Sequence, residues 1–391
     1  MRLGINRNVW AMGWTSLLND ASSELLYPVL PLFLTITLGA PASAVGAVEG
    51  AAGAAAQVVG LAMGRRSDRI RRRMPFVWTG YTLSNIAKPL VALAPAWGWV
   101  MGARAVDRAG KGIRTAPRDA LLRDSSDPSR TGFVFGFHRF MDSLGAVIGP
   151  LIALVLLEAG LSFRQVIAVA IVPAILSMFV LRRIRDIPAR PHEPAAQPDP
   201  DPHRLSDMGR PFWTFTIAWT VFSLGNSADV FLLLRAKDLG LSVTAVVLSY
   251  ALYNTLYSGL SWPLGHLSDR VGKRRVLAVG LLVFAGVYAG FGLAGSGAAV
   301  WPLMAIYGVY IAATDGVSKA LVSDLSPAAL RATGQGAFKL ATGAAAVAAS
   351  LVAGVLWQTV GPGAVFALGA GAALLGLLTL AVTRPARGLA S

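Results

Sequence analysis

The chain alternates between long apolar runs and short polar connections. A helix needs about 20 apolar residues to cross a bilayer, and runs of this length occur throughout the chain. A first set of runs covers residues 9–37, 43–64, 75–95, 97–122, 132–157 and 163–182. A second set covers residues 211–234, 243–264, 275–295, 301–323, 334–358 and 362–383. The pattern predicts an all-α polytopic membrane protein with 12 transmembrane helices.

A short basic motif occurs twice and divides the chain into similar halves. Gly64-Arg-Arg-Ser-Asp68-Arg69 follows the second run, and Gly265-His-Leu-Ser-Asp269-Arg270 follows the eighth. Further basic residues and another apolar run come after each copy. A repeat of about half the chain is typical of transporters whose substrate site lies between two repeats near the bilayer midplane. We therefore predict two pseudo-symmetric six-helix halves, residues 1–184 and 211–391.

The segment between the halves and the distribution of basic residues predict the topology. Residues 185–210 are rich in proline and charge, which favours a flexible or extended linker. Basic residues concentrate in 65–73, 182–190, 204–210 and 270–275, whereas 38–43, 294–300 and 359–363 have none. Because basic loops face the cytoplasm, we expect a cytoplasmic linker and cytoplasmic termini. Without a membrane helix at 97–122, the basic linker would lie outside the cell, so the same rule predicts that this charged run spans the membrane. The run 9–37 is too long to be a cleavable signal peptide.

Composition excludes several classes of protein. The 391 residues are 54% hydrophobic and 14% charged, and the absence of cysteine excludes thiol catalysis and disulfides. The net charge of +15 resides at the ends of apolar runs, where membrane orientation explains it better than nucleic-acid binding. Gly110-Lys-Gly112 is no nucleotide-binding loop. With neither a paired nucleophile and base nor a metal-ligand cluster, we expect no enzyme, no cofactor and no metal site.

The repeated motif resembles the signature loop of the major facilitator superfamily, and the likeness covers the whole chain. Arg104 and Arg130 are similar to family arginines, and Gly145-Ala-Val-Ile-Gly149-Pro150 resembles the motif associated with antiporters. Arg71 replaces the usual glycine in the first loop, although Gly272 keeps it in the second. The Gly-Gly that usually follows the Gly-Pro motif is absent. Segments 19–24 and 107–119 resemble an uncharacterised prokaryotic subgroup.

The resemblance implies a monomer that works by alternating access in a prokaryotic cytoplasmic (inner) membrane. It also implies gating by the two loops and by the glycine-proline motif. The gating residues are then Gly64, Asp68, Arg69, Gly149, Pro150, Asp269 and Arg270.

The predicted fourth helix carries cations at intervals of three or four residues, which places them on one face. They are Arg104, Arg108, Lys111, Arg114 and Arg118. A charge at mid-bilayer costs at least about 2.5–3.5 kcal/mol unless it faces a cavity or a partner. Asp107 offsets one cation, which leaves a surplus for acidic side chains or an anionic substrate to balance. We predict substrate binding for the first three cations, because arginine suits phosphate and carboxylate, and gating for the last two.

Other polar side chains in the apolar runs are candidates for proton coupling or substrate binding. For proton coupling they are Asp20, Glu24, His138, Asp142 and Asp229; for substrate binding they are Asn19, Asn226, Tyr253 and Asn254. A carboxylate beside a cation takes up a proton when alternating access separates the pair, which couples protonation to the cycle. Static ion pairs and aromatic packing are the structural alternatives. Asp315 and Lys319 are expected to neutralise each other, and Glu49 and Lys88 have no clear partner.

These observations favour a secondary active transporter, and specifically a proton-coupled exporter (antiporter) of a small organic anion or amphipathic compound. Alternatives are a divalent metal-cation exporter, which the arginines oppose, a multidrug exporter and a proton-coupled uptake symporter. A receptor or structural protein with the same body would have no use for embedded charges. The expected partners are an anionic small molecule, protons and the lipid bilayer.

Overall fold

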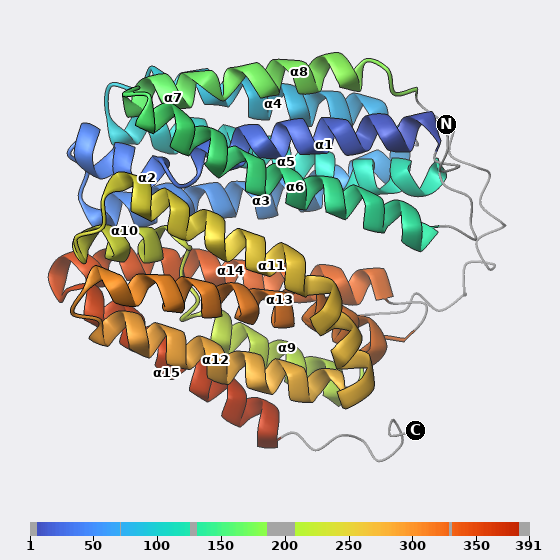
Figure 1. Ribbon diagram of the computed structural model, residues 1–391. Coiled ribbons are helices and arrows are strands. Elements are labelled where there is room, and N and C mark those ends of the chain that lie inside the picture. Colours follow the sequence, from blue (N-terminus) through green and yellow to red (C-terminus); the bar gives the residue numbers. More distant parts are fainter. Residues whose placement is uncertain (1–5, 71, 126–130, 186–207, 328–330, 383–391) are drawn as a thin grey trace. The chain divides into compact units, whose positions relative to one another are not determined.

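The computed structural model describes residues 6–70, 72–125, 131–185, 208–327 and 331–382. Helices occupy every predicted span, and the described residues contain no strand (Figure 1). Helices of the first half are α1 (Arg7–Leu26), α2 (Leu30–Leu32), the π-helical turn η1 (Phe33–Thr37), α3 (Ala42–Ile70), α4 (Met74–Ala92), α5 (Trp97–Asp124), α6 (Thr131–Glu158), α7 (Phe163–Val169) and α8 (Ile171–Leu181). Those of the second half are α9 (Arg210–Ser223), α10 (Val230–Asp238), α11 (Val243–Val271), α12 (Lys273–Leu293), the 3-10 turn η4 (Gly297–Ala299), α13 (Val300–Leu325), α14 (Arg331–Thr359) and α15 (Pro362–Val382).

The chain divides into two compact units. The first consists of residues 1–194 together with 243–251, and the second of 195–242 together with 252–391. Residues 186–207, which form most of the predicted linker, lie outside the described part of the chain. The domain boundaries drawn from the sequence therefore stay predictions.

Three of the predicted spans are interrupted helices. The first span breaks between Leu26 and Leu30, where Pro28 has no N–H to donate to a helix. The seventh breaks between Ser223 and Val230, and the sixth at Ala170. Breaks of this kind are tolerated in membrane helices because neighbouring groups satisfy the freed backbone atoms.

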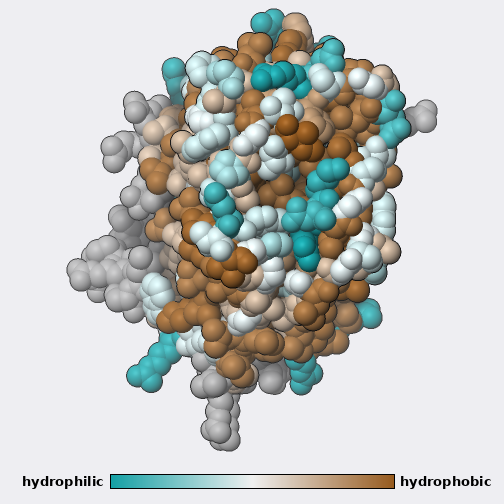
Figure 2. All heavy atoms as spheres, turned by 90° about the vertical axis from the view of Figure 1, so that its left-hand side faces the viewer, coloured by the Kyte–Doolittle hydropathy of each residue, from teal (hydrophilic) through white to brown (hydrophobic). Residues whose placement is uncertain are grey.

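Length and hydropathy agree with a membrane location. Seven helices of the described residues are long and apolar enough to cross a bilayer. The fourth predicted span forms the single long helix α5, although its charges keep it out of that set. Hydrophobic residues cover much of the face drawn in Figure 2, and hydrophilic residues gather there in a few patches.

Glycines allow the helices of the first unit to approach closely. Helix α5 packs along α3 and α4, and α1 packs along α6. A Cβ added to Gly112 of α5 would lie 2.6 Å from the carbonyl oxygen of Ala56 in α3. One added to Gly149 of α6 would lie 2.5 Å from the carbonyl oxygen of Ala21 and 2.6 Å from the backbone nitrogen of Leu25 in α1. Small residues at helix contacts are the usual means of packing in membranes.

We expect Gly149→Ala to destabilise the protein, because the new methyl group meets the backbone of α1 and not a flexible side chain. Overpacking of this kind costs about 1–3 kcal/mol. The measurement is thermal unfolding of the purified protein in detergent. Gly102→Ala in α5 is the matched control, since nothing lies within 4 Å of its Cβ position. Equal melting temperatures for the two variants would contradict the tight contact between α1 and α6.

The core of the second unit is an aromatic cluster. The Phe284 ring stacks on Tyr288 at 3.9 Å between centroids and meets the edges of Phe222 and Tyr310 at 4.9 Å. Tyr307 joins the cluster from α13. Aromatic pairs in such geometry contribute roughly 0.5–1.5 kcal/mol each beyond the area they bury. The cluster holds α9, α12 and α13 together.

Candidate functional site

Arg104 of α5 forms the most deeply buried ion pairs of the first unit's described residues. Its side chain is 3% exposed, and its Nη2 atom lies 2.9 Å from Oε1 of Glu49 in α3. Its Nη1 atom lies 3.0 Å from Oδ2 of Asp107, one turn along the same helix. The sequence analysis left Glu49 without a partner, and the structure corrects this. Arg104 is thus held between two carboxylates, and its predicted role as a substrate ligand stays a prediction.

Arg114 fastens α5 to α4. Its Nη1 atom donates to the Ser84 hydroxyl at 2.7 Å, and Ser84 donates onward to the carbonyl oxygen of Asp107 at 2.8 Å. The guanidinium also lies 4.5 Å from the ring centroid of Tyr81, within the range of a cation–π contact. Arg114 is 3% exposed. Its contacts with α4 fix the rotation of α5 about its own axis, and hence which residues of α5 point away from α4.

A second cluster joins α1, α5 and α6. The Nδ1 atom of His138 lies 3.6 Å from Oδ2 of Asp142, and Ser16 of α1 donates a hydrogen bond to the other oxygen of Asp142. Arg118 of α5 donates to the Ser16 hydroxyl at 3.5 Å and pairs with Asp119 at 3.0 Å. The Nε2 atom of His138 is buried without a hydrogen-bond partner among the described residues. The predicted proton-coupling pair, His138 and Asp142, is therefore brought together.

Lys88 lies in the interior of the first unit with 3% of its surface exposed. Its Nζ atom donates to Oδ1 of Asn85 at 3.3 Å, and Asn85 donates to the carbonyl oxygen of Ala174 in α8. Beside Lys88 is a small cavity that Ser23, Arg104 and Asp107 also line. The sequence analysis gave Lys88 no partner, so this contact is a second correction.

Arg108 and Lys111 differ from the other cations of α5. Their charged ends form no hydrogen bond or ion pair with any other described residue. Both act electrostatically on Glu24 of α1, and Lys111 also interacts with Asp20. Lys111 is exposed and Arg108 half-buried. These two cations are therefore available to a ligand.

The acidic side chains around Glu24 lie on one stretch of α1. The Oε2 atom of Glu24 accepts a hydrogen bond from Tyr250 at 2.6 Å, within the first unit. One turn earlier, Oδ1 of Asp20 accepts from Asn19 at 3.4 Å. The Oδ1 atom of Asn19 is buried and has no partner among the described residues. The carboxylates of α1 thus face the cations of α5.

Taken as one set, the charges described above balance. The cations are Lys88, Arg104, Arg108, Lys111, Arg114 and Arg118. As many carboxylates interact with them: Asp20, Glu24, Glu49, Asp107, Asp119 and Asp142. We call these residues the charge network. Within this set, the cationic surplus expected from α5 alone is matched by carboxylates, most of them on α1, α3 and α6; Arg139 of α6, which acts on His138, lies outside the set.

The polar site of the second unit is built around Asp229, which immediately precedes α10. Its Oδ1 atom accepts a hydrogen bond from Tyr307 at 2.6 Å, and its Oδ2 atom accepts one from Tyr253 at 2.9 Å. The sequence predicts Asn226 and Asp229 inside one continuous span, residues 211–234. Both residues instead lie in the break between α9 and α10, and Asp229 has two tyrosine partners.

Nearby side chains of α11 and α13 form a second contact in this unit. Asp315 accepts from Lys319 at 2.7 Å and from Tyr257 at 3.1 Å. The expected neutralisation of Asp315 by Lys319 is confirmed as an ion pair. Asn254 is buried, and its predicted role in binding stays a prediction.

The predicted gating residues are only partly described. The side chains of Asp68 and Arg69, at the carboxyl end of α3, and the whole of Arg130 lie outside the described part of the chain. At the second copy of the loop, Lys273 lies 3.6 Å from Asp269 and 2.6 Å from Asp324 of α13. Gly272, between α11 and α12, has a φ of 95°, which explains the glycine at this place in the loop.

Sequence reasoning missed Glu49, Ser16, Tyr81 and Tyr307 as members of these sites. Glu49 was visible as a charge within an apolar run, but nothing in its spacing identified Arg104 as the partner. Ser16 and the two tyrosines are too common in membrane helices to be a signal. Among the described residues, no group of three or more His, Asp or Glu side chains lies close enough to hold a metal ion.

Comparison with known proteins gives the family. The family model described as Major Facilitator Superfamily matches residues 12–338 and 230–390. An uncharacterised MFS-type transporter of Methanocaldococcus jannaschii is 34% identical over 390 residues, covering 96% of this chain and 95% of the relative. The puromycin resistance protein of Streptomyces alboniger is 30% identical over 190 residues, which are 46% of this chain and 35% of that protein.

Solved structures show the same fold. A mutant form of the nucleoside transporter NupG superposes with a TM-score of 0.79 at 13% identity, and the match covers 96% of this chain and 99% of that one. The all-helical architecture and the repeated loop found in the sequence agree with this likeness. The match of the family model over most of the chain, together with the archaeal relative, shows that the chain is a membrane transporter that belongs to the major facilitator superfamily.

Proposed function

We propose that this chain is a proton-coupled secondary transporter of a small organic anion or of an amphipathic compound that carries an anionic group. The observation that carries the proposal is the pair Arg108 and Lys111, whose charged ends have no hydrogen-bonding partner among the described residues. A carboxylate or phosphate fits such a pair, because the guanidinium donates two parallel hydrogen bonds and the ammonium adds a point charge. Glu24 interacts electrostatically with both cations, and Asp20 with Lys111.

The charge balance of the network supports coupling to protons. When Asp20 or Glu24 takes up a proton, one cation of α5 loses its counter-charge. A substrate anion restores the balance, so protonation and anion binding influence each other through the same side chains. His138 and Asp142 form a second place where a proton can reside, joined to α5 through Ser16 and Arg118.

The direction that we propose is export in exchange for protons, across a prokaryotic cytoplasmic membrane with both termini in the cytoplasm. The antiporter-like motif at Gly145–Pro150 supports it, and the similarity of half of the chain to a puromycin resistance protein is compatible with it. For export by exchange, the proton and the substrate occupy the protein in alternate halves of the cycle. His138 and Asp142 are the proton site that we propose for this task, joined to α5 through Ser16 and Arg118.

Uptake by proton–anion symport is a second candidate, and the charge balance favours it. A proton on Glu24 or Asp20 makes the site more attractive to an anion, so the two ligands load together. In this scheme both move in the same direction across the membrane. The two candidates thus predict opposite effects of a pH gradient on substrate movement.

The experiment that separates them uses proteoliposomes with the purified full chain. Radiolabelled citrate, phosphate and glycerol phosphate serve as probes, each loaded inside or outside. Exchange predicts that an anion accumulates on the acidic side of the membrane, and symport predicts accumulation on the alkaline side. An anion distribution that follows the membrane potential alone, with no response to either pH gradient, would contradict proton coupling in both forms.

A further inference from the structure

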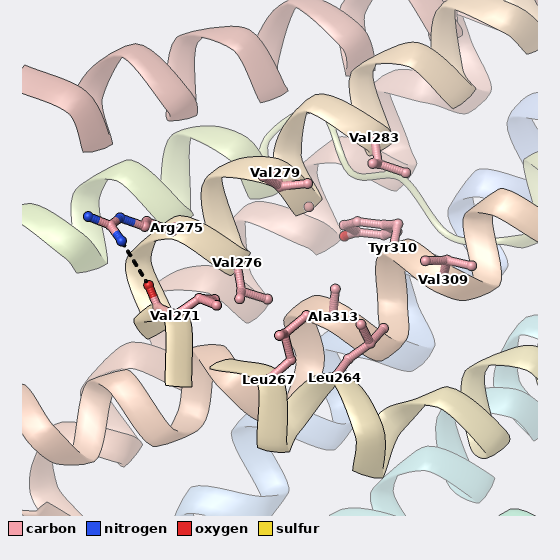
Figure 3. A pocket seen from close by; sticks show the side chains of 11 residues that line it. Leu264, Leu267, Val271, Arg275, Val276, Val279, Val283, Val309, Tyr310 and Ala313 are labelled. Atoms are coloured by element: carbon pink, nitrogen blue, oxygen red, sulfur yellow. Dashed lines mark hydrogen bonds between the residues drawn. The ribbon is translucent and has the colours of Figure 1, made fainter. Parts of the chain in front are cut away.

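A groove in the second unit has no part in the proposed transport site. It lies between the carboxyl-terminal part of α11, α12 and α13, and it has a volume of about 220 Å³. Its lining is almost wholly apolar. Figure 3 shows Val276, Val279 and Val283 of α12 beside it, with side chains of α11 and α13 opposite.

The groove opens to the surroundings of the protein. Leu267, Val271 and Val279, all of which line it, are 43%, 39% and 59% exposed. Such a lining offers water almost no hydrogen-bonding partner. In a bilayer the surrounding molecules are lipids, so a hydrocarbon chain is the occupant that this environment supplies.

One end of the groove is basic. Arg275 belongs to the lining, and its Nη1 atom donates to the carbonyl oxygen of Val271 at 3.4 Å (Figure 3). An arginine has five N–H donors, so this single bond leaves the others for a ligand. Arg270 is not itself part of the lining but immediately precedes Val271, which is. It is exposed and forms no hydrogen bond or ion pair with any other described residue.

The neighbouring charges do not cancel these arginines. Asp269 and Asp324 both form ion pairs with Lys273, which offsets part of their negative charge. Arg274 donates to the carbonyl oxygen of Leu380 and keeps its charge. A net positive charge therefore remains where an apolar groove ends, and a phosphodiester headgroup attached to an acyl chain matches both features.

We propose that this groove binds an anionic phospholipid, with one acyl chain along α12 and the phosphate on Arg275 and Arg270. The valines of α12 that line it extend over eight residues, from Val276 to Val283. At 1.5 Å per residue this is about 12 Å of apolar wall. The site is independent of the charge network, which belongs to the first unit.

The test measures lipid binding and needs no transport substrate. Purified full-length protein in detergent receives phosphatidylglycerol, phosphatidylcholine or soluble glycerol phosphate, and bound lipid is counted by native mass spectrometry beside thermal unfolding. We expect phosphatidylglycerol to bind more tightly than phosphatidylcholine and to raise the melting temperature. Loss of a charge-assisted hydrogen bond in Arg275→Gln should weaken this binding roughly tenfold.

Three further variants separate the groove from general effects of charge. Val279→Trp fills the groove and should also weaken binding of phosphatidylglycerol, whereas Leu293→Trp on the same helix, at a position 87% exposed, should not. Arg183→Gln in the first unit is the control for loss of a basic residue. Equal binding of both lipids, unchanged binding by Arg275→Gln and Val279→Trp, or binding of glycerol phosphate that is equally tight and equally sensitive to Arg275→Gln would overturn the proposal.

Discussion

Replacing Arg104 by methionine is expected to destabilise the protein by about 3–5 kcal/mol, the usual cost of removing one partner from a buried ion pair. The substitution leaves Glu49 and Asp107 together in the interior, with side chains 10% and 11% exposed and no cation between them. The measurement is unfolding of the purified protein in detergent, by heat or by denaturant. Arg183→Met, at an exposed position after α8, is the control for loss of a positive charge.

The physical cause can be tested in the same experiment. Protonation neutralises the two stranded carboxylates, so the deficit of Arg104→Met should shrink as the pH falls. The combined variant Arg104→Met, Glu49→Gln, Asp107→Asn removes all three charges and should recover most of the lost stability. If the single variant were as stable as the wild type, or the combined variant no better than the single one, the ion pairs would not hold α3 against α5.

Replacing Arg108 by alanine is expected to weaken the binding of an anionic substrate by about ten- to a hundredfold, the loss of one or two hydrogen bonds to a charged group. Stability should change little, because Arg108 has no hydrogen-bond or ion-pair partner to strand among the described residues. This contrast with Arg104 distinguishes a ligand-binding cation from a structural one on the same helix.

The measurement for Arg108 is the rise in melting temperature that an anion produces, since a ligand that binds only the folded state stabilises it. Citrate, phosphate and glycerol phosphate are the probes. Arg108→Lys should retain part of the effect, because it keeps the charge and loses the bidentate geometry. An anion effect that survives in Arg108→Ala at full size would place the substrate elsewhere.

The helices could be predicted from the sequence because hydrocarbon demands long apolar runs and leaves few alternatives. The fourth span is the instructive example. Its composition alone resembles a soluble segment, yet the basic loops lie on one side of the membrane only if this segment also crosses it. The structure has the single helix α5 there, from Trp97 to Asp124. The breaks at Pro28 and between Ser223 and Val230 were not predicted, since proline and glycine are tolerated inside membrane helices.

The charge network could be predicted only in part. The intervals between the cations in the sequence placed them on one face of α5, because the face that residues of one helix share depends on helical geometry alone. They could not pair Arg104 with Glu49, since that contact joins residues far apart in the sequence through the packing of α3 on α5. The same limit explains why Tyr307 was not recognised as a partner of Asp229.

We propose that anion binding and proton binding are coupled through the charge network. The most direct test of this coupling follows the pH of a weakly buffered solution of the purified protein while citrate, phosphate, glycerol phosphate, ethidium or Zn²⁺ is added. We expect proton movement with anions, absent in Arg108→Ala and in Asp20→Asn; release of protons would favour exchange, and uptake would favour symport. Proton movement only with ethidium or Zn²⁺, or an anion signal indifferent to Arg108→Ala, would contradict it.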